Sequence, residues 1–112
     1  MFTIFGFYKF QKINNLKKHQ INLNNLLLDK NINGSIIISK EGLNGSISGL
    51  NKEIKTTIIQ IKKSLDIRKF DSFNKSKSEF QPFHKPKIKI KKEVVPMDLK
   101  MMNKSKKKNS HI

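Results

Sequence analysis

Two amphipathic helical patterns, separated and flanked by strand-like runs, constrain the fold of this chain more than any other feature. Residues 13–29 and residues 51–65 each repeat apolar residues at helical spacing, and most of their lysines lie off that stripe. The stripes consist of Ile13, Leu16, Leu23 and Leu27 in the first pattern and of Ile54, Ile58, Ile61 and Leu65 in the second. Asn51 is suited to cap the second helix, because its side chain can accept a bond from a free backbone N–H. We therefore predict two helices, each with one face to be buried.

Strand-like runs lie before and between the two helical patterns. Residues 2–10 are rich in aromatic and β-branched residues, and we expect this strand to be covered on both faces, with Tyr8 in the core. Residues 35–39 form a short apolar run that is typical of a buried strand. Residues 46–48 would be the strand that returns after a turn.

A further strand is predicted near the end of the apolar pattern. Residues 87–91 alternate strictly between lysine and isoleucine, so that Ile88 and Ile90 can face the core while the lysines line up on the other face. Residues 92–95 extend this strand.

The segment between the second helix and the last strand is polar and punctuated by phenylalanines. We assign no helix or strand to residues 70–83, and we expect Phe80 and Phe83 to pack in the core rather than to stack on bases. The predicted order is then β-α-β-β-α-β. This order favours an α+β fold, a split β-α-β sandwich in which two helices cover one face of an antiparallel sheet.

The strongest local signal is the turn that follows residues 35–39. It contains Glu41, Gly42, Asn44 and Gly45, and because Asn and Gly tolerate positive φ we predict a tight reversal at Asn44-Gly45. A plain hairpin turn is the first interpretation of these four residues. The second is a loop that faces RNA or a partner domain.

The charge of the chain favours a polyanionic partner. The net charge is +16, from 24 Lys plus Arg against 8 Asp plus Glu, which suggests nucleic acid first and an anionic membrane surface second. Codon bias in an AT-rich genome explains part of the lysine excess, but not its concentration in residues 84–112. The candidate RNA-binding residues are Lys87, Lys89, Lys91 and Lys92, whose alternative interpretation is a solvated strand face.

Several kinds of chemistry find no support in the sequence. Without cysteine the chain has no disulfide, thiolate nucleophile or cysteine-ligated metal. We interpret His19, His84 and His111 as surface residues rather than metal ligands, and we predict no metal site and no catalytic residue, since the acids are scattered singly. The fold order invites comparison with acylphosphatases, but the connection at residues 11–15 lacks the glycine-rich phosphate loop.

No run is long enough to span a membrane, and we expect a soluble cytoplasmic protein.

Two segments together resemble a known family. Residues 34–49, GSIIISKEGLNGSISG, and residues 82–95, PFHKPKIKIKKEVV, resemble the N-terminal domain of the bacterial tRNA uridine hydroxylases, which are rhodanese-related. The resemblance extends over roughly residues 4–97 and rests on the EGxNG and KxKKE stretches in this order. Lysines stand where the family tends to have arginine or apolar residues, and a lysine is a point charge rather than a bidentate fork.

The resemblance implies a fold, a reaction and partners. It implies a ferredoxin-like domain at residues 1–97, followed by a basic linker or disordered tail at residues 98–112 that leads toward a rhodanese-like domain. The full-length protein is implied to hydroxylate the wobble uridine of tRNA to 5-hydroxyuridine, with molecular oxygen as co-substrate and an essential cysteine in the rhodanese-like domain.

By this resemblance the partners of the chain are tRNA and the C-terminal rhodanese-like domain, with no membrane. We expect the chain by itself to be inactive and to hold no cofactor. Two other functions stay open, a stand-alone basic module that binds RNA or protein without catalysis, and a small hydrolase of the acylphosphatase type.

Overall fold

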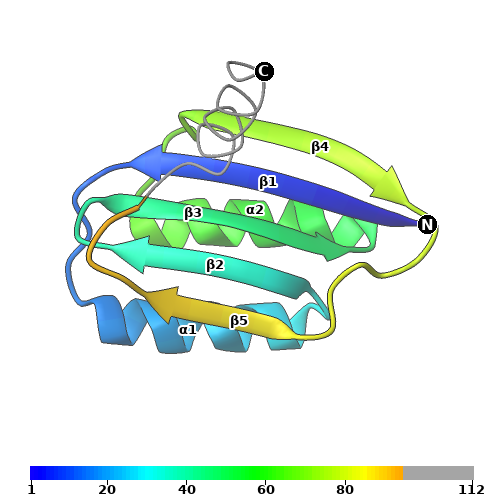
Figure 1. The fold of residues 1–112 in the computed structure, drawn as a ribbon, viewed down its shortest axis with the longest axis horizontal. Coiled ribbons are helices and arrows are strands. Elements are labelled where there is room, and N and C mark those ends of the chain that lie inside the picture. The colour runs from blue at the N-terminus through cyan, green and yellow to red at the C-terminus, as the bar shows by residue number, and fades with distance from the viewer. Residues whose placement is uncertain (95–112) are drawn as a thin grey trace, which may run out of the picture.

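The computed structural model of this chain describes residues 1–94, in which two helices cover one face of a five-stranded sheet (Figure 1). The elements in chain order are β1 (Phe2–Phe10), α1 (Leu16–Asp29), β2 (Asn33–Ser39), β3 (Gly42–Gly49), α2 (Asn51–Leu65), β4 (Ser72–Ser78) and β5 (Pro86–Ile90). The predicted tail, residues 98–112, and the predicted boundary at residue 97 lie outside the described residues.

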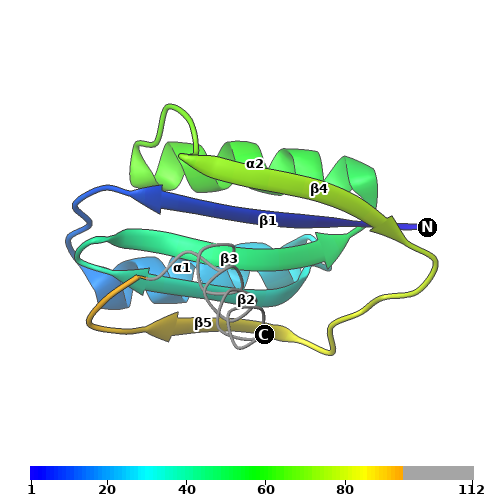
Figure 2. The ribbon, with the colours of Figure 1, turned by 45° about the horizontal axis from the view of Figure 1, so that its top comes forward.

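The sheet has the strand order β4-β1-β3-β2-β5. The predicted α+β sandwich with both helices on one face is confirmed, and Figure 2 shows α2 on the β1–β4 side of the sheet and α1 on the β2–β5 side. The prediction of a wholly antiparallel sheet is wrong in one strand pair. β5 runs parallel to β2, from Gly34 opposite Pro86 to Ile38 opposite Ile90. Because Ile90 ends the strand, the predicted extension over residues 92–95 is wrong for residues 92–94, and its last residue lies outside the described residues.

The strand that the sequence pattern missed is β4. It pairs with β1 from Ser78 opposite Phe2 to Ser72 opposite Tyr8. Five of its seven residues are exposed, so its sequence, SFNKSKS, carries no alternation of apolar and polar residues. An edge strand of this kind is held by backbone hydrogen bonds to its neighbour, which leave no trace in hydrophobic periodicity.

The hydrophobic core lies between the sheet and the helices. The helices cover the β1 face that carries Phe5 and Phe7, and the ring of Phe7 lies 4.8 Å from that of Phe70 between centroids. The fully buried side chains around these rings include Leu23, Leu27, Ile36, Ile38, Leu43, Ile47, Ile54 and Ile61. The expected covering of both β1 faces is wrong, because Tyr8 on the opposite face is only half-buried and outside the core. Phe80 is 71% exposed, contrary to its predicted place in the core.

Two further local predictions need correction. The reversal between β2 and β3 is the two-residue turn Lys40-Glu41, which follows Ser39 and precedes Gly42. Asn44-Gly45 lies inside β3. Asn51 does not cap α2 with its side chain, since its Oδ1 instead accepts a hydrogen bond of 3.2 Å from Thr3 Oγ1.

Gly45 is required by packing rather than by a positive φ. A Cβ at this position would lie 2.8 Å from the Ser35 carbonyl oxygen and 3.0 Å from both Ile36 Cγ1 and Phe7 Cζ. Gly42, at the start of β3, does have a positive φ, of 148°, and a Cβ there would lie 2.0 Å from the Lys9 carbonyl oxygen. Both glycines therefore let β3 lie close to its neighbours.

We predict that Gly45→Val destabilises the domain by about 1–3 kcal/mol, because a larger side chain in a packed core forces neighbouring groups apart. The matched control is Gly6→Ala, whose Cβ would meet only the exposed Asn74 side chain, at 3.1 Å. We expect this control to change stability by less than about 0.5 kcal/mol. Urea unfolding measures both, and a Gly45→Val midpoint equal to that of the parent would contradict the close packing of β3 around Gly45.

Asp71 connects the end of β1 to the start of β4. Its Oδ2 accepts a hydrogen bond of 2.7 Å from the Phe10 N–H, and its Oδ1 lies 3.3 Å from Lys9 Nζ. The Phe10 N–H, followed by Lys9 and Lys69, lowers the pKa of Asp71 from its usual 3.8, while desolvation opposes this. The carboxylate is therefore favoured in the folded state.

A lowered folded pKa makes the stability contribution of Asp71 dependent on pH. The contribution is fully present above the unfolded pKa and is lost as the pH falls through the folded pKa. Asp71→Asn should thus be less stable than the parent at neutral pH, by under about 1 kcal/mol because the pair is partly exposed. The gap should narrow below about pH 4. Urea midpoints at several pH values measure the stability difference between the parent and Asp71→Asn. A difference that stays constant in acid would refute the pH-dependent contribution of Asp71.

Candidate nucleic-acid interface

Several connections gather at one end of the sheet. The end of β1, the start of α1, the β2–β3 turn and the end of β5 all lie there, at the left in Figures 1 and 2. Gln11 donates its N–H to the Glu41 carbonyl oxygen at 2.8 Å, and Ile13 donates to that of Lys40 at 3.2 Å. On the other side, the Val94 N–H lies 3.4 Å from Glu41 Oε2. The turn is therefore held between the β1–α1 connection and the segment after β5.

The structure separates the four residues that were predicted to form one loop. Glu41 and Gly42 lie at the β2–β3 turn as expected. Asn44 and Gly45 are buried within β3, where Asn44 pairs with Tyr8 on one side and with Ile37 on the other. The loop that could face a partner is therefore shorter than predicted.

The four lysines predicted to bind RNA are also divided between two surfaces. Lys87 and Lys89 are exposed on the sheet face that the helices leave open, beside Ser35 and Ile37 of β2. Their neighbour Ile88 is buried, as predicted. The companion prediction for Ile90 is wrong, since Ile90 ends the strand and its side chain is 39% exposed.

Lys91 and Lys92 contribute instead to a hollow of about 390 Å³. This hollow, which we call the lysine hollow, is lined by Leu16, Lys40, Ile90, Lys91 and Lys92. The Lys91 N–H donates to the Ile38 carbonyl oxygen at 2.9 Å, which holds the segment after β5 beside the end of β2. Sequence reasoning missed Lys40, although it directly precedes the turn that was singled out.

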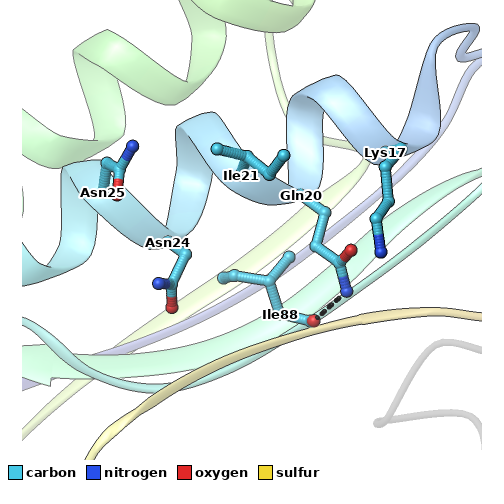
Figure 3. Close-up of a pocket in the computed structure, with 6 residues that line it drawn as sticks. All are labelled: Lys17, Gln20, Ile21, Asn24, Asn25 and Ile88. Atoms are coloured by element: carbon cyan, nitrogen blue, oxygen red, sulfur yellow. Dashed lines mark hydrogen bonds between the residues drawn. The ribbon is translucent and has the colours of Figure 1, made fainter.

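A second hollow of about 300 Å³ lies between α1 and β5 (Figure 3). This hollow, which we call the amide hollow, is lined by Lys17, Gln20, Ile21, Asn24, Asn25 and Ile88. The Gln20 side-chain amide donates to the Ile88 carbonyl oxygen at 2.8 Å, so it occupies an acceptor on the free edge of β5. No sequence pattern indicated this hollow, because it depends on α1 lying beside β5.

In the described part of the chain, the lysines that line the two hollows are not neutralised by acids. Within residues 1–94 the ion pairs are Lys9 with Asp71 and Lys30 with Asp29, so neither hollow contains one. The first turn of α1 has no acidic residue, and no side chain caps its N-terminus. An uncapped helix N-terminus adds to the positive potential of the nearby ammonium groups.

The remaining candidate residues lie elsewhere. His84 is exposed, whereas His19 is half-buried with an unpartnered Nδ1, and His111 lies outside the described residues. Across residues 1–94, no three His, Cys, Asp or Glu side chains gather in a way that could hold a metal ion. In the same part of the chain, no helix has the length and apolar character needed to cross a membrane.

The family to which the sequence is similar agrees with the observed fold. Residues 2–94 match the family described as the UPF0176 acylphosphatase-like domain. The chain belongs to this family. The match covers every helix and strand of the structure.

Relatives of this UPF0176 domain carry a consistent name. A protein of Pelagibacter ubique named tRNA uridine(34) hydroxylase is 60% identical over 112 residues, which are 100% of this chain and 37% of that protein. A protein of the same name from Neorickettsia sennetsu is 29% identical over 96 residues, 86% of this chain and 34% of that protein. The chain thus spans about a third of these relatives' length, and it corresponds to their N-terminal part.

Solved structures agree with the fold. An acylphosphatase from Bacillus subtilis superposes with a TM-score of 0.55 at 9% identity, over 81% of this chain and 100% of that one. At this identity the likeness concerns the fold alone. The β1–α1 connection of the UPF0176 domain lacks glycine, and its Gln11 and Ile13 N–H groups are already donated to the β2–β3 turn. These two N–H groups are therefore not available to a phosphate.

Proposed function

We propose that this chain is the tRNA-positioning N-terminal domain of an oxygen-dependent tRNA uridine hydroxylase, which forms 5-hydroxyuridine at the wobble position. The observation that carries the proposal is the 60% identity over the whole chain to a protein named tRNA uridine(34) hydroxylase. The role of this domain in the reaction would be to bind and orient the tRNA.

The distribution of charge supports an RNA-binding role. The net charge is +16, and Lys87, Lys89, Lys91 and Lys92 are exposed at one edge of the sheet. Exposed lysines that neutralise phosphates release counterions and so drive binding to nucleic acid. Lys40 joins this set at the lysine hollow, where it lies beside two of the four.

The chemical step is proposed to belong to the part of the protein beyond this chain. The chain contains no cysteine, so the essential cysteine would lie in a rhodanese-like domain in the remaining two thirds of the relatives' length. Molecular oxygen would be the co-substrate there. The complete protein would act in the cytoplasm, and this chain alone would form no 5-hydroxyuridine.

A salt-dependent binding titration with tRNA tests the proposed function. The parent chain should bind tRNA with an affinity that falls steeply as salt rises. Changing Lys87, Lys89, Lys91 and Lys92 together to Gln should reduce the slope of log affinity against log salt by roughly three units, at about 0.7–0.9 per phosphate contact. Stability should change little, because all four side chains are exposed.

The matched control changes four exposed lysines on α2 and β4, Lys52, Lys55, Lys63 and Lys77, to Gln. This control removes the same charge, and it should retain most of the parent's slope of log affinity against log salt. Equal losses in both variants would mean that net charge alone drives binding, as in a nonspecific basic module. Absence of tRNA binding by the parent chain would refute the proposed function.

A further inference from the structure

The lysine hollow and the amide hollow follow one another along the line where α1 lies beside β5. On β5 they are lined by Ile90 and Ile88, two residues apart on the same strand. On α1, Leu16 lines the lysine hollow, and residues between Lys17 and Asn25, on the following turns of the helix, line the amide hollow. We call the two hollows together the α1–β5 groove. Its basic part lies at the end of the sheet where the β2–β3 turn is held.

The lysine hollow combines three lysines with a mostly apolar wall. Three of its five lining residues are lysines, no carboxylate lines it, and Leu16 and Ile90 provide an apolar wall. Glu41 is the acid next to Lys40 in sequence, and its Oε2 accepts a hydrogen bond from the Val94 N–H. The three lysines that line this hollow form no ion pair within residues 1–94, so their charges are available to a phosphate bound there.

The amide hollow has the composition of a base-reading site. Gln20 is fixed by its hydrogen bond to Ile88, as Figure 3 shows, while the side-chain amides of Asn24 and Asn25 make no hydrogen bond within residues 1–94. Side-chain amides present a donor and an acceptor that match the edges of nucleobases. The exposed side chain of Ile21 offers apolar surface to the face of a base.

The size of the hollows decides what form of RNA can enter. At about 390 and 300 Å³, each lies near the lower end of the range for small-ligand sites. A base that is stacked and paired in a duplex cannot present its pairing edge to such a hollow, whereas an unpaired base can.

We propose that the α1–β5 groove binds one unpaired nucleotide of an RNA, with its phosphate in the lysine hollow and its base in the amide hollow. This rests on the proposed function, because it assumes that the partner is RNA. It deepens that function by assigning the contact to single-stranded nucleotides, such as those of a loop, and to two separate groups of residues.

The test uses fluorescence anisotropy of the full chain with short oligoribonucleotides, single-stranded and as duplexes of the same sequence. Changing Lys40, Lys91 and Lys92 to Gln should weaken binding of every single strand and lower the slope of log affinity against log salt by about 0.7, the value for one phosphate contact on a single strand. Changing the same three lysines to Arg keeps the charge and should retain the slope. The matched control changes Lys52, Lys55 and Lys63 on α2 to Gln.

The amide hollow is tested by Asn24→Ala with Asn25→Ala, which leaves Gln20 and its hydrogen bond in place and favours the helix. This variant should keep the salt slope of the parent. Its base selectivity, the ratio of the highest to the lowest affinity among oligo-U, oligo-C and oligo-A, should fall by roughly fivefold or more relative to the parent. Thermal unfolding of each variant verifies that the fold is intact.

The outcomes separate the groove from the proposed function. If Lys87→Gln with Lys89→Gln abolishes tRNA binding while the groove variants bind as the parent does, the RNA lies on the open sheet face. The groove proposal is then overturned and the proposed function stands. A parent chain that prefers duplex to single strand would also overturn the groove, and one that binds no RNA would refute both.

Discussion

The parallel pairing of β5 with β2 determines where the basic residues of this chain can act. It sets Ile36 opposite Ile88 and Ile38 opposite Ile90, which turns Ile88 toward α1 and leaves Lys87 and Lys89 on the open face of the sheet. The same pairing brings the end of β5 beside the end of β2, so that Lys91 and Lys92 line the same hollow as Lys40. Without this strand pair, α1 would have no neighbour along that edge and neither hollow would form.

The β2–β3 turn is the second constraint, because it is held from both sides. The β1–α1 connection donates two backbone N–H groups to it, and the segment after β5 approaches Glu41. Gly42 lets the start of β3 approach the end of β1, and Gly45 lets the middle of β3 lie against Phe7. The glycines of the turn region thus support packing, and they place Lys40 at a fixed position near the start of α1.

Much of the fold could be predicted from the sequence because it rests on burial. Both helices and the strands β1 and β5 place apolar residues at a regular period in the sequence, β2 is a continuous apolar run, and β3 was expected from the turn that precedes it. β4 could not be predicted in the same way, since its exposed residues are held by backbone pairing with β1. Its absence from the predicted order led to the assignment of the Lys87–Lys91 strand to an antiparallel position.

The candidate site was predicted only in part, for a related reason. The lysines of β5 were found because they alternate with isoleucine. Their division between two surfaces was not, because it depends on where the strand ends, and Ile90 is the last residue in the ladder. Lys40, Gln20 and Asn24 join the site only through tertiary contacts between elements far apart in the chain, which no local pattern encodes.

RNA is proposed to contact this domain along α1 and β5. A titration of the isotope-labelled chain with an anticodon stem-loop, followed by amide NMR shifts, locates this contact. We expect the shifts to concentrate on residues 16–25, on Lys40 and Glu41, and on residues 87–92, and the exposed face of α2 to be unaffected. Shifts confined to α2 and β4, with α1 and β5 unchanged, would place the RNA on another surface and refute the contact along α1 and β5.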